Sequence, residues 1–179
     1  MNTLRRRQVL GGLGTFALTA AVPRTALADW RRQYPVLRYG VITTETGEAL
    51  SSVYKTFDQY LGRALGVKTE MFFAAEYAAV IEALKSNRVQ LAQLYAGSYA
   101  AAFDAIQGDI EPLAMNVANG AMGYHSYLVV KADSPYQKLE DLKGKKLAMS
   151  DPNSTSGYIM PIFYLAKQGI KLNEFFGQA

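Results

Sequence analysis

The sequence of 179 residues contains no cysteine and only one histidine and one tryptophan. Without cysteine, the chain has no disulfide, no thiol nucleophile, no cysteine-based metal site and no lipid-modified cysteine. A histidine outside any cluster usually packs against its neighbours or lies at a rim, and we expect that role for His125. No Gly-x-Ser-x-Gly motif is present either, so a serine-hydrolase elbow is excluded. We therefore expect a protein that is not an enzyme and that uses no cofactor and no metal.

The net charge is also zero once residues 1–28 are excluded. Residues 1–28 hold four of the 19 basic residues and no acidic residue, so residues 29–179 carry 15 of each sign. A balanced charge gives no reason to expect a nucleic acid as partner. Residues 29–179 also have no apolar run long enough to cross a bilayer, so we expect no membrane anchor.

The excess positive charge belongs to a segment typical of an export signal. Three arginines at residues 5–7 precede an apolar, glycine-rich stretch of 14 residues at 9–22, and residues 26–28 (ALA) form a cleavage motif. The order RRQVL fits a twin-arginine signal, although Arg5 stands where serine or threonine is usual; an ordinary secretory signal is the alternative. We predict that residues 1–28 are a signal peptide cleaved after Ala28 and that the mature protein is periplasmic.

Strand-like and helix-like patterns alternate through the first part of the mature chain. The patterns predict strands at 36–43, 67–73, 89–95 and 111–117, and helices at 50–65, 77–84 and 98–106. Such alternation indicates an α/β lobe with a parallel sheet, and we assign residues 29–120 to it. Ligands of open α/β sheets bind beyond the carboxyl ends of the strands. Tyr77 lies at such a place, and Tyr95 and Ser98 are second-rank candidates there.

Residues 121–179 predict a hinge strand and part of a second α/β lobe. The patterns indicate strands at 124–131 and 146–150, a helical turn at 139–145 and a helix after residue 153. Two strands and one helix cannot cover both faces of a sheet, so we expect this lobe to be incomplete in the chain. We expect it to expose apolar side chains, namely Ile159, Ile162, Phe163 and Leu165.

The most informative motif is DPNSTSGY at residues 151–158, because Ser154, Thr155 and Ser156 stand where a helix begins. The first backbone N–H groups of a helix have no partner inside it, and the helix start carries partial positive charge. Such a start can hold an oxyanion without any basic side chain. Simple N-capping is the alternative, but a cap needs one oxygen and three hydroxyls leave two spare.

Several segments together resemble the periplasmic phosphate-, phosphite- and phosphonate-binding proteins of ABC transporters, which have the type II periplasmic binding protein fold. The segments are residues 39–46 (YGVITTET), 72–81 (FFAAEYAAVI), 123–127 (GYHSY), 133–135 (DSP), 139–146 (LEDLKGKK) and 151–158 (DPNSTSGY). The resemblance implies two lobes with parallel-rich sheets flanked by helices. It covers only the N-terminal part of the family, whose second lobe continues well past the helix of the hydroxyl triplet.

The resemblance also implies a function and a set of contacts. Ser154, Thr155 and Ser156 would grip the oxygens of the ligand, and Tyr77 and Tyr124 would donate to the same oxyanion or line the cleft. The protein would be the exported solute-binding component of an ABC importer that captures a small phosphorus oxyanion, whether phosphonate, phosphite or phosphate. A membrane permease and its ATPase partner would receive it. A truncated or non-transport fragment of this fold, either a sensor module or an enzyme acting on a small anionic substrate, is the alternative.

Overall fold

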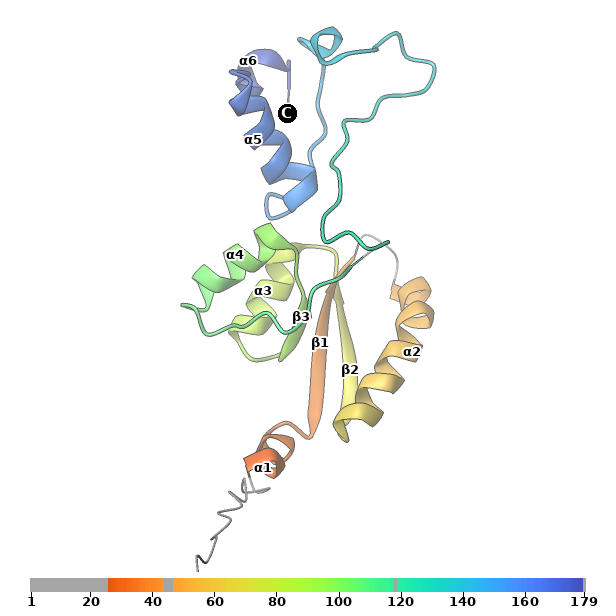
Figure 1. Cartoon of the computed structure of the whole chain (residues 1–179), viewed down its shortest axis with the longest axis vertical. Helices are drawn as coiled ribbons and strands as arrows, with labels where there is room; N and C mark the ends of the chain where they lie inside the picture. The colour runs from red at the N-terminus through yellow and green to blue at the C-terminus, as the bar shows by residue number, and fades with distance from the viewer. Residues whose placement is uncertain (1–25, 44–46, 118, 179) are drawn as a thin grey trace, which may run out of the picture. The chain divides into compact units, whose positions relative to one another are not determined.

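The computed structural model describes residues 26–43, 47–117 and 119–178 (Figure 1). The predicted export signal up to residue 25 and the loop residues 44–46 lie outside the described residues. Helix α1 (Ala26–Gln33) belongs to a unit of its own, and in it the Arg31 guanidinium lies 5.2 Å from the centre of the Trp30 ring. Helix α1 runs through the predicted cleavage point, and cleavage there stays a prediction.

The unit that begins at Tyr34 is built on a three-stranded parallel sheet. Strands β1 (Val36–Ile42), β2 (Lys68–Ala74) and β3 (Leu91–Gln93) are arranged in the order β2-β1-β3. Strand β1 pairs with β2 along its whole length, and with β3 over three residues at its carboxyl half. The predicted parallel sheet and its first three strands are therefore confirmed, with β3 shorter than expected.

The three predicted helices of this part are also confirmed. Helices α2 (Gly47–Leu65), α3 (Tyr77–Lys85) and α4 (Ala96–Ala105) follow β1, β2 and β3 in turn. Gly66 ends α2 because it adopts φ +69° and donates its N–H to the carbonyl oxygen of Gly62 at 2.9 Å. Glycine enters this left-handed region without steric cost, which makes it the usual residue after a helix.

Helix α2 covers one face of the sheet, and α3 and α4 lie on the other (Figure 1). Successive residues of β1 show this division, since side chains alternate between the faces of a sheet. The Tyr39 ring packs edge-on against Phe57 of α2 at 5.3 Å, whereas a Cβ on Gly40 would lie 2.9 Å from Cγ1 of Val80 in α3. The buried apolar residues of the unit up to α4 are Leu37, Val41, Val80, Ile81, Ala83, Val89 and Ala102.

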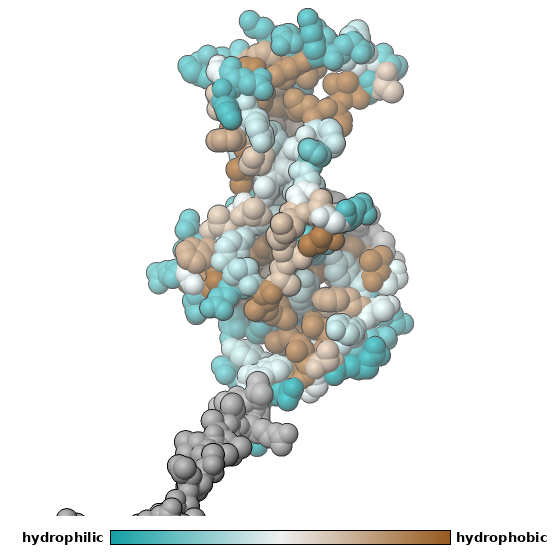
Figure 2. Space-filling view, viewed as in Figure 1, coloured by the Kyte–Doolittle hydropathy of each residue, from teal (hydrophilic) through white to brown (hydrophobic). Residues whose placement is uncertain are grey.

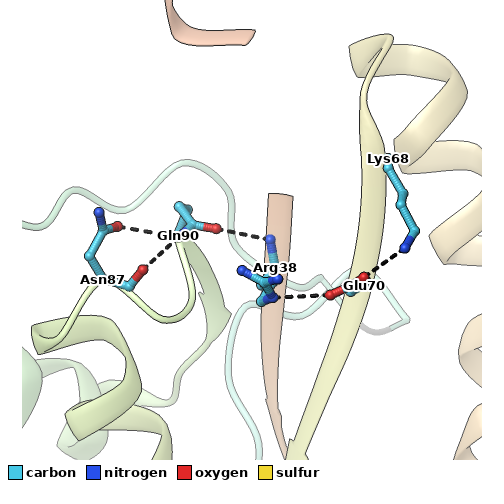
Figure 3. A network of polar contacts seen from close by, with 5 residues as sticks. All are labelled: Arg38, Lys68, Glu70, Asn87 and Gln90. Atoms are coloured by element: carbon cyan, nitrogen blue, oxygen red, sulfur yellow. Dashed lines mark hydrogen bonds and ion pairs between the residues drawn. The ribbon is translucent and has the colours of Figure 1, made fainter. Parts of the chain in front are cut away.

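Polar contacts join the amino-terminal ends of the strands (Figure 3). Glu70 of β2 accepts from Arg38 Nε at 3.0 Å and from Lys68 Nζ at 2.8 Å, and these contacts lower the pKa of its carboxyl, with the bond from Lys68 first. Gln90, just before β3, accepts from the backbone N–H of Arg38 at 3.0 Å and donates to the carbonyl oxygen of Asn87 at 2.8 Å. Exposed ion pairs add little stability, but these contacts tie the three strands together in one register.

Three of the predicted strands are wrong. The chain is irregular through most of residues 111–117, 124–131 and 146–150, and in the last of them Lys146 forms a single isolated parallel bridge with Gln178. A strand exists only through backbone hydrogen bonds to a neighbour, and no neighbouring strand accompanies these segments in the described part of the chain. The apolar pattern that indicated strands is present, but the pairing that would complete them is not.

The last third of the chain contains short helical elements. They are a 3₁₀ turn η1 (Leu139–Leu142), a π-helical turn η2 (Thr155–Ile159), and helices α5 (Met160–Lys167) and α6 (Leu172–Phe175). Residues 34–179 form one unit, so the predicted division into lobes at residues 120 and 121 stays a prediction. Within the residues that the structure describes, no helix has the length and apolar character of a membrane span.

This last third exposes much apolar surface, as Figure 2 shows by its brown residues. Ile159 is 38% exposed and Phe163 is 55% exposed, which agrees with the expectation for this segment. Leu165 contradicts it, because it is 5% exposed. Ile162 is half-buried.

Candidate anion-binding site

A tyrosine lies at the start of each helix that follows the carboxyl ends of β2 and β3. Tyr77 is the first residue of α3, and Tyr95 is the N-cap of α4. Their rings lie side by side, with centroids 6.3 Å apart and planes tilted by 43°. The parallel pairing of β1 with both neighbours brings the two helix starts together, because parallel strands end at the same edge.

Tyr124 interacts electrostatically with Tyr95 even though its segment is irregular. The pKa of the Tyr95 phenol is raised, first by burial and then by the neighbouring phenols of Tyr77, Tyr124 and Tyr54. The tyrosine from the predicted hinge therefore acts electrostatically on Tyr95 at the sheet edge. Tyr124 itself is 64% exposed. The neighbouring His125 is also exposed, and its ring centre lies 6.2 Å from that of Tyr127.

Ser154 has the capping role that one hydroxyl of the triplet was expected to have. It is the N-cap of η2, 6% exposed, and its Oγ accepts from the backbone N–H of Gly157 at 3.2 Å. The preceding turn is held by Asp151, whose Oδ1 accepts from the backbone N–H of Asn153 at 2.8 Å. A Cβ on Gly157 would lie 2.4 Å from the Cβ of Ser150, so only glycine fits there.

Thr155 uses its hydroxyl to join the triplet to the first helices. Its Oγ1 accepts from the backbone N–H of Gly97 in the first turn of α4 at 2.8 Å. Figure 1 shows the start of α4 facing the turn that leads into α5. The approach is close, since a Cβ on Gly97 would lie 2.4 Å from Cδ1 of Ile159 and 3.1 Å from the carbonyl oxygen of Asn153. The Thr155 oxygen accepts in this contact, so its own hydrogen is still available to donate.

Ser156 is held through its backbone and not through its side chain. Its carbonyl oxygen accepts from Ser126 Oγ at 2.6 Å, a bond that ties the segment after Tyr124 to the triplet. Among the described residues, the Ser156 hydroxyl has no hydrogen-bond partner. The three hydroxyls therefore differ in role: Ser154 caps η2, Thr155 accepts from Gly97, and the Ser156 hydroxyl is unpaired within the described part of the chain.

The sequence reasoning missed two of these contributors. Gly97 carries no signal in the sequence, because a glycine in the first turn of a helix has no required role. The hydroxyl of Tyr54 in α2 reaches Gln93 Oε1 at 3.1 Å at the same end of the sheet, and the sequence pattern gave Tyr54 no role. Ser98, a second-rank candidate, is fully buried and caps α4 through bonds with the backbone of Tyr95, so its hydroxyl is already used.

The surface also has two hollows. One of about 220 Å³ is bounded by Leu128, Tyr136 and Leu139, and one of about 310 Å³ by Leu128, Pro161 and Tyr164. The second is mainly apolar, whereas the first is also lined by Gln137 and Lys138, and neither is lined by any of the predicted site residues. An anion needs several hydrogen-bond donors, so we place the candidate site at the hydroxyl-rich end of the sheet.

Comparison with known proteins identifies the family of the chain. A family model described as the periplasmic substrate-binding protein of phosphonate ABC transporters matches residues 39–179. The phosphonates-binding periplasmic protein of Escherichia coli K12 is 37% identical over 154 residues, covering 83% of this chain and 45% of that protein. The phosphate-import protein PhnD of Mycolicibacterium smegmatis is 32% identical over 133 residues, covering 72% of this chain and 41% of that protein.

A solved structure gives the same result for the fold. The crystal structure of a binding protein component of an ABC phosphonate transporter from Pseudomonas aeruginosa superposes with a TM-score of 0.70 at 30% identity, covering 80% of this chain and 49% of that one. The chain thus spans about half the length of the relatives that it matches. Its fold is the α/β fold of type II periplasmic binding proteins. The chain belongs to the family of periplasmic substrate-binding proteins of phosphonate ABC transporters.

Proposed function

We propose that this chain forms the anion-binding part of an exported solute-binding protein, which captures a small phosphorus oxyanion and delivers it to a membrane permease and its ATPase. The names of its relatives support a phosphorus oxyanion as ligand, since one is named for phosphonates and another for phosphate import. Because those two names differ, we keep phosphonate, phosphite and phosphate together as one ligand class. The family description supports a periplasmic location.

The observation that carries the proposal is the meeting of hydroxyl and amide donors at one end of the sheet. Thr155 contacts the start of α4, whose N-cap Tyr95 packs against Tyr77, and the Ser156 hydroxyl is unpaired among the residues that the structure describes. The groups that act electrostatically on Tyr95 are phenols, with no basic side chain among them. The donors of the proposed cradle are therefore uncharged.

An uncharged cradle suits a protein that must bind and then release a small anion. Fixed dipoles at helix starts and hydroxyl hydrogens stabilise negative charge without a counter-ion. A site that binds through hydrogen bonds discriminates against ligands that cannot accept from all its donors, because an unpaired buried donor costs free energy. In our proposal Ser154 shapes the turn, while Thr155, Ser156, Tyr77 and Tyr124 contact the anion.

An NMR titration tests the proposal, since it detects weak as well as tight binding. We expect methylphosphonate, phosphite or phosphate to shift the backbone amides of Ser154–Gly157 and of Gly97 along saturating curves. Sodium chloride at the same ionic strength should leave the chemical shifts of these amides unchanged. Ser156→Ala should weaken the binding of that anion about tenfold, since a hydrogen bond to a charged group is lost.

The matched control is Thr56→Ala, which removes an exposed hydroxyl from α2. It should leave the titration unchanged. If the three anions produce only the small, non-saturating shifts that chloride produces, the chain has no specific anion site and the proposal is wrong.

A further inference from the structure

Tyr95 is the best-positioned polar side chain at the sheet edge to which no role has been given. Its backbone is fixed as the N-cap of α4, because its N–H donates to Ser98 Oγ at 2.8 Å and its carbonyl oxygen accepts from Tyr99 N at 2.7 Å. These bonds fix the backbone of Tyr95, and with it the Cβ atom, but they do not involve the phenol hydroxyl. The ring then lies beside Tyr77, with centroids 6.3 Å apart.

The hydroxyl of Tyr95 differs from that of the nearby Tyr54. The Tyr54 hydroxyl is bound to Gln93 Oε1 at 3.1 Å, whereas the Tyr95 hydroxyl has no hydrogen-bond partner within the described part of the chain. Tyr95 as a whole is 38% exposed, so a ligand can reach it. Burial and the neighbouring phenols raise the pKa of Tyr95, so the hydroxyl keeps its proton at neutral pH and can donate it.

We infer that Tyr95 is a third tyrosine contacting the anion, and that with Tyr77 and Tyr124 it determines specificity for tetrahedral oxyanions with three terminal oxygens. This inference rests on the proposed function of the same site. The two helix starts and the segment around residue 124 bring one phenol each, from three separate parts of the chain. Three phenol donors from separate parts of the chain would suit three oxygens on a tetrahedral centre better than the two oxygens of a planar carboxylate.

Tyrosine NMR can follow each phenol separately. With ¹³Cζ-labelled tyrosine, Tyr77→Phe, Tyr95→Phe and Tyr124→Phe each remove one signal and so assign it. Titration with sodium methylphosphonate or inorganic phosphate should shift the Tyr95 signal along the same saturation curve as those of Tyr77 and Tyr124. Acetate at equal ionic strength should shift them less.

Affinity provides the second readout. Tyr95→Phe keeps the ring and removes only the hydroxyl, so it should weaken methylphosphonate or phosphate binding about tenfold, as expected for one hydrogen bond to a charged group. Tyr99→Phe is the matched control, since Tyr99 lies one turn further along α4 and packs on Phe103 at 6.2 Å. That variant should bind as the unaltered protein does.

The outcomes separate this inference from the proposed function. If the signals of Tyr77 and Tyr124 shift while that of Tyr95 stays, or if Tyr95→Phe binds like Tyr99→Phe, then the role of Tyr95 is refuted and the anion site stands. If no tyrosine signal responds to methylphosphonate or phosphate, the proposed function fails and the role of Tyr95 fails with it.

Discussion

The contact between Thr155 and Gly97 gives the sharpest test of how the site is built. Thr155→Val keeps the branched shape of the side chain and removes the hydroxyl that accepts from Gly97 N–H at 2.8 Å. The residue at position 97 is half-buried, so water can replace part of the lost bond. We therefore expect the free energy of unfolding without ligand to fall by about 0.5–1.5 kcal/mol, the net value of an ordinary hydrogen bond.

The same substitution should affect anion binding more strongly than stability. The Thr155 hydroxyl accepts from Gly97 and so has its hydrogen left for a ligand oxygen, and an accepting hydroxyl is polarised into a better donor. Loss of one hydrogen bond to a charged group costs about 1.5–3 kcal/mol, which corresponds to roughly ten- to hundredfold weaker binding. Urea unfolding measures the first effect, and calorimetric or NMR titration with methylphosphonate and phosphate measures the second.

Thr155→Ser is the control for both measurements. It restores a hydroxyl at the same position, so it should recover most of the stability and most of the affinity. Affinity that is unchanged in Thr155→Val would refute the role of this hydroxyl in ligand binding. An unchanged urea midpoint would show that the bond to Gly97 adds nothing in solution.

Three further predictions follow from the described contacts. Gly97→Ala should lower the free energy of unfolding by about 1–3 kcal/mol, because its Cβ would meet Cδ1 of Ile159 at 2.4 Å; adding Ile159→Val should recover part of the loss in urea unfolding. Ser98→Ala should cost about 1–2 kcal/mol, because it removes the buried cap of α4, and thermal unfolding followed by circular dichroism measures it. The carboxyl of Glu70 has a lowered pKa in the folded protein, so its contribution is present above its ordinary pKa of 4.5 and is lost as pH falls through the lower folded value. The urea midpoints of the unaltered protein and of Glu70→Gln should therefore differ at neutral pH. They should converge as the pH falls from about 5 towards the lowest pH at which the protein stays folded.

Each of these predictions has a result that contradicts it. Equal loss in Gly97→Ala with and without the change at Ile159 would mean that the clash is with the backbone of Asn153 instead. Ser98→Ala with unchanged melting would show that water replaces the cap. A difference between the unaltered protein and Glu70→Gln that grows as the pH falls would contradict the sign derived for the carboxylate.

Local chemistry explains which elements were predicted correctly. The helical spacing of apolar residues and a glycine at its end identified α2, and the apolar runs of β1 and β2 identified their strands. Ser154 as an N-cap is equally local, since its Oγ binds the N–H of a residue only three positions away. Features of this kind depend on residues close in sequence, and a sequence pattern therefore contains them.

The incorrect strands show the opposite case. Residues 124–131 have the aromatic and β-branched composition of a strand, yet Val129 is 85% exposed and the segment has no neighbouring strand in the described structure. Composition measures how well side chains suit a pleated surface. The hydrogen bonds that make a strand come from a partner segment, whose presence no local pattern can supply.

The sequence by itself determined the hydroxyl triplet, the tyrosines and the alternation of strands and helices, because these depend on residue type and local spacing. Only the tertiary structure decided which triplet hydroxyl is used where: Thr155 accepts from Gly97, 58 residues away, while the Ser156 hydroxyl stays free in the described structure. It also decided that Tyr95 lies beside Tyr77, because that meeting requires β2 and β3 to end at the same edge of one sheet. The parallel order of the strands sets these distances, and no single segment of the chain encodes it.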